Sequence, residues 1–418
     1  MELYYSFSLL IVIAAVFSYI NVRFLKLPST IGVMVIAMVV SISLVAVGKS
    51  YAWIHNEAAA IVSNVNLSEV LMGAMLNFLL FAGAIHISMH DLRQQRIPIM
   101  IFSTLGVIIS TAVVAVMLYF AFQLLHMDIP YIECLVFGAL ISPTDPIAVL
   151  SILRKARIRK SLEIKVAGES LFNDGVAIVL FTLFVQLARG SQVEVTFIHV
   201  TGLFVQETLG GIGIGILLGY IGSHGIRTIE NYKVTVLITL AIVMGGYLIA
   251  RYLHISSPLT MVAAGLVIGN YGKATAMSRA DTDYLDKFWE LIDDIMNAML
   301  FLIIGLEILL IADLNQYWMI GCIAIGIVLL ARFFSVWLPI RFIPNIGRFD
   351  PKSITILVWG GIRGGVSVAL ALTLDHTPNQ NLFLAITYYV VIFSIVVQGL
   401  TIGKIAKKQR SFTQLKKT

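Results

Sequence analysis

Long apolar runs recur along this 418-residue chain, and they constrain its fold more than any other feature of the sequence. A run of about 18 or more such residues can cross the ~30 Å hydrocarbon layer of a membrane as a helix. Hydrophobic residues make up 59% of the chain and charged residues 12%, against roughly 45–50% and 25% in soluble domains. A single water-soluble core cannot bury this much apolar surface. The sequence therefore predicts an all-α polytopic membrane protein.

Hydropathy divides the chain into about thirteen predicted membrane spans. The first run has no cationic residue before it and no small-residue cleavage site, so we expect a retained span rather than a signal peptide. An odd number of spans places the two termini on opposite sides of the membrane. The predicted spans cover residues 4–24, 29–48, 69–89, 98–125, 131–153, 164–188, 199–223, 233–252, 257–270, 289–311, 315–340, 353–374 and 381–403.

The net charge of +6 is concentrated in the short loops. Cytoplasmic loops retain Lys and Arg, and assigning alternate loops to the cytoplasm leaves only Lys49, Arg189 and Arg251 on the other face. The N-terminus is therefore predicted outside and the C-terminus in the cytoplasm. The basic cluster from Arg154 to Lys165 is expected to contact anionic membrane lipids. No nucleic-acid partner is expected.

The fifth predicted span contains a proline pair around polar residues, Ser142-Pro143-Thr144-Asp145-Pro146. Prolines remove backbone donors and disfavour helix in the preceding residue, so we expect the span to unwind at Thr144 and Asp145. A broken helix at membrane depth is tolerated where it lines a cavity or is buried in protein. It also frees carbonyl groups that bind ions in transporters. The alternative is a proline kink with an isolated aspartate.

The sixth predicted span carries four polar side chains within about one turn. Ser170 and Asp174 are four residues apart and share one helix face, and Glu169 and Asn173 form the adjacent stack. Hard cations take oxygen ligands of this kind. The span therefore predicts a cation site, the alternative being a role in helix packing alone.

Two arginines lie inside predicted spans. Arg363 stands in the glycine-rich twelfth span and cannot lose its charge, so it should pair with a buried carboxylate, either Glu169 or Asp145. Arg332 lies in the eleventh span, and spacing alone does not name its partner. A structural role for Arg332 is as well supported as a functional one.

Breaks in spans five and twelve occupy corresponding positions if the chain contains two six-helix repeats, an arrangement typical of transporters. A separation of seven spans makes the repeats inverted. We therefore predict one transmembrane domain with a first repeat (1–188), a linking helix (199–223), a second repeat (233–403) and a short cytoplasmic tail (404–418). Gly211, Gly215 and Gly219 in the linking helix have the spacing of a close helix contact.

No Walker-type phosphate-binding motif occurs in the sequence, so ion gradients are the expected energy source. Neither an enzymatic activity nor a cofactor is expected. His86 and His90 are not expected to form a metal site. An acidic segment at the start of the tenth span is expected to be a solvated face, with a cation-attracting funnel as the alternative; it contains Asp281, Asp283, Asp286, Glu290, Asp293 and Asp294.

Together, three motifs resemble the monovalent cation:proton antiporters of the sodium/proton exchanger type, including bacterial NhaP-like members. The resemblance implies a thirteen-span homodimer of the bacterial inner membrane, with a scaffold domain and a mobile six-helix core that holds two crossed, broken helices. The motifs are Ser142-Pro143-Thr144-Asp145-Pro146, Gly168-Glu169-Ser170-Leu171-Phe172-Asn173-Asp174-Gly175 and Gly360-Gly361-Ile362-Arg363-Gly364.

The resemblance makes Asp174 the carboxylate that binds either a proton or Na⁺. It adds the Ser170 hydroxyl and the Thr144 backbone as Na⁺ ligands, and places Asp145 behind a water molecule or in an outer layer. Asn173 is implied to stabilise the broken helices, and an asparagine before the essential aspartate is associated with electroneutral exchange in this family.

The resemblance also implies that Glu169 pairs with Arg363. One position departs from the family pattern, because Ala82 stands where many members have an acidic residue in the third span. Ion preference is therefore not carried over, and Li⁺ or K⁺ exchange remains an alternative to Na⁺ exchange. An ion channel, a sensor and an intramembrane aspartyl hydrolase using Asp145 and Asp174 are more remote alternatives.

Overall fold

The computed structural model describes most of the chain. The residues described are 2–48, 53, 73, 75–145, 149–150, 153, 158–189, 197–229, 231–309, 316–343, 346, 349–374 and 379–406. Part of the basic cluster after the fifth predicted span and residues 407–418 of the predicted tail lie outside this set.

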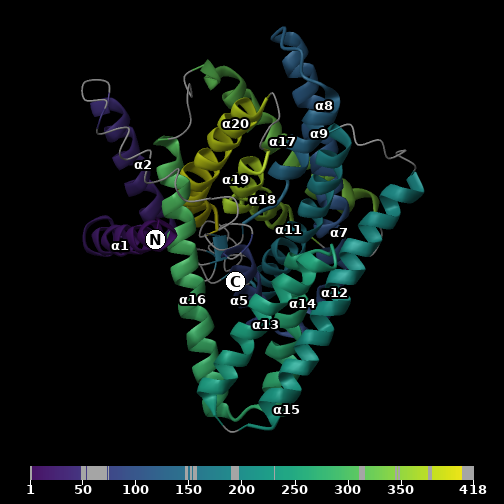
Figure 1. The fold of residues 1–418 in the computed structure, drawn as a ribbon. Coiled ribbons are helices and arrows are strands. Elements are labelled where there is room, and N and C mark those ends of the chain that lie inside the picture. The colour runs from purple at the N-terminus through teal and green to yellow at the C-terminus, as the bar shows by residue number, and fades with distance from the viewer. Residues whose placement is uncertain are drawn as a thin grey trace, which may run out of the picture.

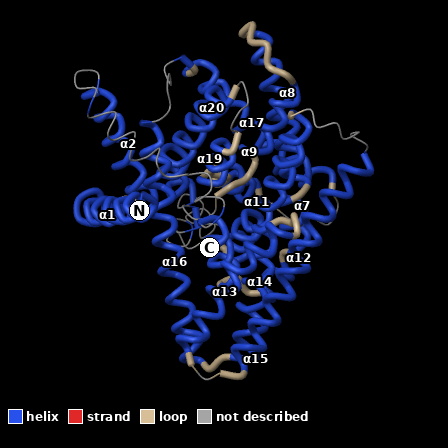
Figure 2. Tube along the Cα trace, in the orientation of Figure 1, coloured by secondary structure: helices blue, strands red, loops and turns tan. Residues whose placement is uncertain are grey.

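The described residues form helices and loops, with no strand among them (Figure 2). The α-helices are α1 (Glu2–Ile20), α2 (Ser29–Gly48), α5 (Leu76–Ile85), α6 (Met89–Gln94), α7 (Arg96–Ser103), α8 (Leu105–Leu124), α9 (Tyr131–Ile141), α11 (Lys160–Ala188), α12 (Phe197–Arg227), α13 (Tyr232–Tyr252), α14 (Ser257–Val267), α15 (Lys273–Ala276), α16 (Arg279–Leu306), α17 (Trp318–Phe342), α18 (Pro351–Trp359), α19 (Gly365–Leu372) and α20 (Gln380–Ile392). Shorter π-helical or 3₁₀ segments extend four of them, at Asn21–Leu25 (η1), Ile268–Gly272 (η3), Glu307–Leu309 (η4) and Phe393–Gln398 (η6).

Within the described residues, eight helical segments are long and apolar enough to cross a membrane. The apolar helices α5 and α9 are shorter. Each of the thirteen predicted ranges overlaps helix in the structure, so the all-helical prediction is confirmed, whereas the count of thirteen crossings stays a prediction. In Figure 1, α12, α13 and α16 converge on the short helix α15 at the bottom of the view, and α17, α19 and α20 lie in the upper half.

Two helices are broken where the sequence predicts breaks. Helix α9 ends at Ile141 and the chain is non-helical from Ser142 to Asp145; α18 ends at Trp359 and α19 begins only at Gly365. The two breaks meet, because the Asp145 backbone N–H donates to the Ile362 carbonyl at 2.7 Å. The prediction of crossed, broken helices is confirmed.

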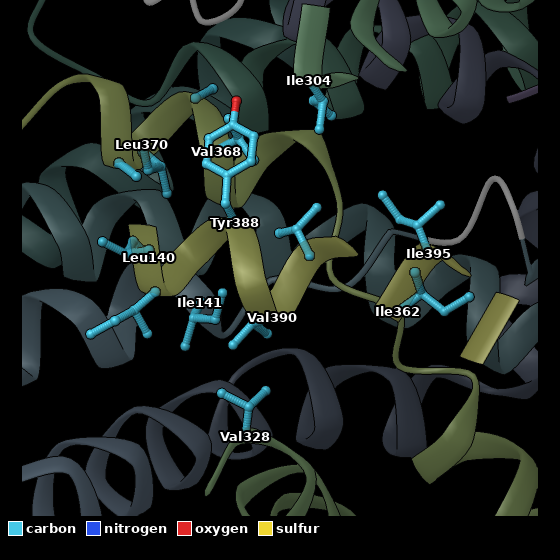
Figure 3. Packing of buried hydrophobic residues seen from close by; sticks show 14 of the residues in the cluster. Leu140, Ile141, Ile304, Val328, Ile362, Val368, Leu370, Tyr388, Val390 and Ile395 are labelled. Carbon is cyan, nitrogen blue, oxygen red and sulfur yellow. The ribbon is translucent and has the colours of Figure 1, made fainter. Parts of the chain in front are cut away.

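Apolar side chains fix both breaks in the interior. Ile141, at the end of α9, and Ile362, inside the second break, are 0% exposed. Val368 and Leu370 of α19 and Val390 of α20 pack in the same cluster (Figure 3). The unwound backbone is therefore held by tertiary packing rather than by its own helical hydrogen bonds.

The glycine spacing in α12 produces a close helix contact. A Cβ added at Gly215 would collide with the Thr260 carbonyl group on α14, and one at Gly219 would press on Val267. Such approach of backbones is the usual consequence of small residues spaced by four in a membrane helix.

Candidate functional site

A cavity of about 670 Å³ connects exposed carboxylates with the broken helices. Its walls come from α5, the α9 break, α11, α16 and the start of α19. Glu290 and Asp294 are exposed at its rim, whereas Asp174 is only 6% exposed. A water-accessible path therefore leads from the surface to a carboxylate buried between the helices.

Three side chains, one from the break after α9 and two from α11, form a buried hydrogen-bonded cluster next to Asp174. The hydroxyl groups of Thr144 and Ser170 lie 3.0 Å apart, and the Asn173 amide donates to the Thr144 hydroxyl at 2.8 Å. The Asn173 amide oxygen has no hydrogen-bond partner. The proline-induced break explains this geometry, because it turns Thr144 out of a helical path toward α11.

Both aspartates of the motifs line the cavity. Asp174 lies one helical turn beyond Ser170, and both line the cavity, as their spacing of four residues predicts. Asp145 is half-buried, and its carboxyl group lies against Gly364 so closely that a Cβ there would collide with it. Two carboxylates and two hydroxyl groups thus gather around one buried space. These hard oxygen donors suit a small cation that has shed part of its water.

Glu169 pairs with Arg332, not with Arg363 as the resemblance implied. The Arg332 guanidinium donates to the Glu169 carboxylate at 2.5 Å, and both residues are buried. Two more Arg332 nitrogens donate to the Leu357 carbonyl of α18, at 3.0 and 3.2 Å. The partner of Arg332, which spacing did not name, is therefore Glu169.

Arg363 binds the other break through its backbone. One guanidinium nitrogen donates to the carbonyl groups of Ser142 and Pro143, the latter at 3.0 Å. These carbonyls are free because the helix ends at Ile141, so the buried cation meets backbone dipoles instead of a carboxylate. The expected carboxylate pairing of Arg363 is wrong for this reason.

Most of the acidic segment of α16 faces the cavity. Asp286, Glu290, Asp293 and Asp294 all line it, and Glu290 and Asp294 are also exposed to solvent, so the segment is solvated as expected, and the cation-attracting funnel stays an alternative prediction. Their spacing of three and four residues puts them along one side of α16. The remaining two acids of the segment do not line the cavity.

Lys273 and His86 contact Asp286 at the cavity rim. The Lys273 ammonium group pairs with Asp286 and donates to the Ile85 carbonyl at 3.0 Å. His86 also approaches Asp286, at 3.4 Å between Nδ1 and Oδ1. These contacts tie α5 and the η3–α15 segment to the start of α16.

Two polar residues of the interior were missed by the sequence reasoning. Ser367 of α19 lines the cavity, is 0% exposed, and its hydroxyl has no hydrogen-bond partner in the part of the chain that the structure describes. Glu307 interrupts the apolar run at the end of α16 and is 2% exposed. Arg332 was selected because it is a charged residue inside an apolar run. The same criterion, applied to the whole sequence, also selects Glu307. Ala82, the departure from the family pattern, lines the cavity as well.

Comparison with known proteins assigns this architecture to a family. The family profile described as "Sodium/hydrogen exchanger, transmembrane" matches residues 11–408. The chain belongs to this family. The exchanger is 45% identical over 407 residues to the Na(+)/H(+) antiporter NhaP of Pseudomonas aeruginosa, covering 95% of each chain. It is 32% identical over 396 residues to the Na(+)/H(+) antiporter NhaH of Halobacillus aidingensis, covering 92% of this chain and 93% of the relative.

Solved structures show the same fold. The exchanger superimposes on the sodium proton antiporter MjNhaP1 from Methanocaldococcus jannaschii at pH 8 with a TM-score of 0.77, covering 97% of this chain and 99% of that chain at 19% identity. The family predicted from the three motifs is confirmed, and the exchanger is a multi-pass membrane protein.

Proposed function

We propose that the exchanger is a secondary antiporter that exchanges Na⁺ for H⁺ by competition at Asp174. The observation that carries the proposal is the position of Asp174, at the buried end of an acid-lined cavity and beside the meeting point of two broken helices. The similarity to relatives that are named Na(+)/H(+) antiporters supports the choice of ions. No cofactor is required, because the ion gradients supply the energy.

In the proposed cycle, Na⁺ enters along the cavity and loses water as it reaches Asp174. Ser170 and the Thr144 backbone replace part of that water, and Asp145 acts through a remaining water molecule. An ionised carboxylate and a bound cation stabilise each other, whereas a proton on Asp174 removes the charge that holds the cation. The site therefore carries one ion or the other, and one charge moves in each direction.

Asn173 supports this stoichiometry. Its amide group donates to Thr144 and adds no charge to the site, so Asp174 has no second carboxylate beside it in the chain at position 173. We infer electroneutral exchange, in which the membrane potential contributes little to the driving force. A large transport current in proteoliposomes would contradict this inference.

The proposed movement is alternating access in a homodimer of the bacterial inner membrane. The core that carries both broken helices moves against a scaffold, with the two inverted repeats (1–188 and 233–403) joined by the linking helix (199–223). The N-terminus lies outside and the tail (404–418) lies in the cytoplasm, as the loop charges favour. In this orientation the cavity opens toward the cytoplasm, on the side of the loop that contains Lys273 and Arg279.

The test is dissipation of a pH gradient in proteoliposomes after addition of Na⁺, Li⁺ or K⁺, for the wild type and Asp174→Asn. Exchange that depends on a cation and disappears in the variant is expected, with Na⁺ most effective. A response to K⁺ alone would change the ion assignment and keep the mechanism. Normal exchange by Asp174→Asn, with the protein reconstituted to the same level, would remove Asp174 from its assigned role.

A further inference from the structure

A second carboxylate without a cationic partner lies in the apolar interior, outside the cavity. Glu307 follows the last residue of α16, and its Oε2 atom has no hydrogen-bond partner among the described residues. Ion pairs in the described part of the chain join other residues, and none involves Glu307. A charge at membrane depth is costly, so such a residue needs a partner or a transported ion.

The Tyr388 hydroxyl is a second buried polar group without a partner. Tyr388 is 0% exposed, its hydroxyl makes no hydrogen bond among the described residues, and it interacts electrostatically with Glu307. In Figure 3 the hydroxyl points away from Leu140, Ile141 and Val390, which belong to the same buried apolar cluster as Tyr388. Two polar groups from α20 and the end of α16 thus keep unused hydrogen-bonding capacity in one buried region.

The surroundings of Glu307 suit a proton better than a metal ion. Helix α2 packs against this end of α16, where the Ser41 hydroxyl donates to the Gly305 carbonyl at 2.9 Å, and α2 contains no ionisable residue. The ionisable residues of α20 are Tyr388 and Tyr389, and Tyr389 lies against Gly321 of α17. A dehydrated metal cation needs several oxygen ligands, whereas a proton needs one carboxyl group.

Glu307 continues the stripe of α16 that lines the cavity. Asp286, Asp293, Leu300 and Glu307 follow each other at intervals of seven residues, which returns a helix to nearly the same face, with about 20° of drift per step. The first three line the cavity, and Leu300 lies against Gly365 at its inner end. Glu307 lies about 10 Å farther along the axis, beyond the end of the open space.

We propose that Glu307, together with the Tyr388 hydroxyl, is a proton-binding site on the half of the transport path that this conformation closes. When the core movement opens that half, a proton from the opposite face binds Glu307 before it reaches Asp174. In that open conformation the Tyr388 hydroxyl, which makes no hydrogen bond among the described residues here, donates to the carboxylate and orients it. This inference rests on the proposed exchange at Asp174.

The test measures the pH dependence of exchange separately at each membrane face, in right-side-out and everted vesicles. For Glu307→Gln, the external pH that gives the half-maximal rate is expected to fall by roughly one unit, equivalent to a tenfold higher proton concentration. The dependence on pH at the cavity face should stay as in the wild type. Asp293→Asn, which removes a carboxylate from the cavity, should show the reverse pattern.

Two variants separate this role from a purely structural one. Tyr388→Phe removes one oxygen atom and should shift the same face in the same direction by a smaller amount. Glu207→Gln is the matched control, because it neutralises a half-buried carboxylate that does not line the cavity. It should leave both pH profiles unchanged.

Outcomes that overturn the proposal are equally specific. Glu307 would bind no transported proton if Glu307→Gln had wild-type pH profiles at both faces. The same conclusion would follow if the variant lost an equal part of its exchange rate from both faces. If Glu307→Gln does not reach the membrane, Tyr388→Phe decides the question by the same criterion. Failure of the proposed exchange itself would show separately, as normal activity of Asp174→Asn.

Discussion

Glu169 and Arg332 form a buried ion pair next to the proposed cation site. The two residues are 163 positions apart and come from α11 and α17. Ser170 directly follows Glu169, and Arg332 also holds the last turn of α18 through the Leu357 carbonyl. The pair therefore fixes α11 relative to the second break. The pair acts mainly by positioning these helices, since a buried ion pair adds little net stability over apolar residues of the same volume.

Replacing one member of this pair should be more harmful than replacing both. Glu169→Gln or Arg332→Met leaves an uncompensated buried charge, at a cost of about 3–5 kcal/mol. The double variant should recover much of that loss, which thermal unfolding of the purified protein in detergent can measure. Simple additivity of the two single effects would contradict the pairing. Glu207→Gln again provides a control with the same change in charge.

Sequence reasoning selected polar residues that the structure brings together at the cavity, but not all their contacts. The motifs selected Thr144, Ser170 and Asp174 because their types and spacing are local properties of two segments. The pairing of Arg332 with Glu169 depends on how distant helices pack, which spacing cannot reveal. Arg363 was misassigned because a carboxylate was assumed to be the only partner for a guanidinium, whereas the break supplies free carbonyls.

At the scale of elements, α12 and α14 pack so closely that side-chain volume at their contact is restricted. The breaks in α9 and α18–α19 were predictable from proline and glycine, because these residues act on the local backbone. The direction faced by the acidic side of α16 was not, since an amphipathic helix turns its polar face toward water wherever water lies. Here the water-filled space is the cavity inside the protein.

Two glycines of α12 offer a test of that contact. Gly215→Ala should destabilise the protein by about 1–3 kcal/mol, because the added methyl group collides with the Thr260 carbonyl and the backbones must separate. Gly213→Ala is the matched control on the same helix, since a Cβ there meets no atom within 4 Å. It should be neutral or slightly stabilising, because alanine favours helix. Equal melting temperatures for both variants would contradict the close packing.

At the scale of the whole molecule, the charge distribution directs cations toward one end of the path. The chain carries a net charge of +6, yet the cavity is lined by carboxylates from α16, by Asp145 at the break after α9 and by Asp174 of α11. A cleft with charge of one sign concentrates counter-ions and raises their rate of entry. The cavity can therefore attract Na⁺ to a protein that is cationic as a whole.

This attraction should depend on ionic strength in a measurable way. Glu290→Gln removes an exposed charge at the cavity rim, so the half-saturating Na⁺ concentration at that face should rise a few-fold in dilute buffer. The difference from the wild type should shrink as an impermeant salt is added, because the screening length falls from about 30 Å at 0.01 M to about 8 Å at 0.15 M. Asp283→Asn removes one charge from the same helix but does not line the cavity, so it should change the Na⁺ dependence little. A Glu290→Gln effect that persisted unchanged at high salt would indicate direct coordination of the ion instead of long-range attraction. An equal effect of Asp283→Asn would show that the field of the whole N-terminal part of α16 acts rather than that of the cavity.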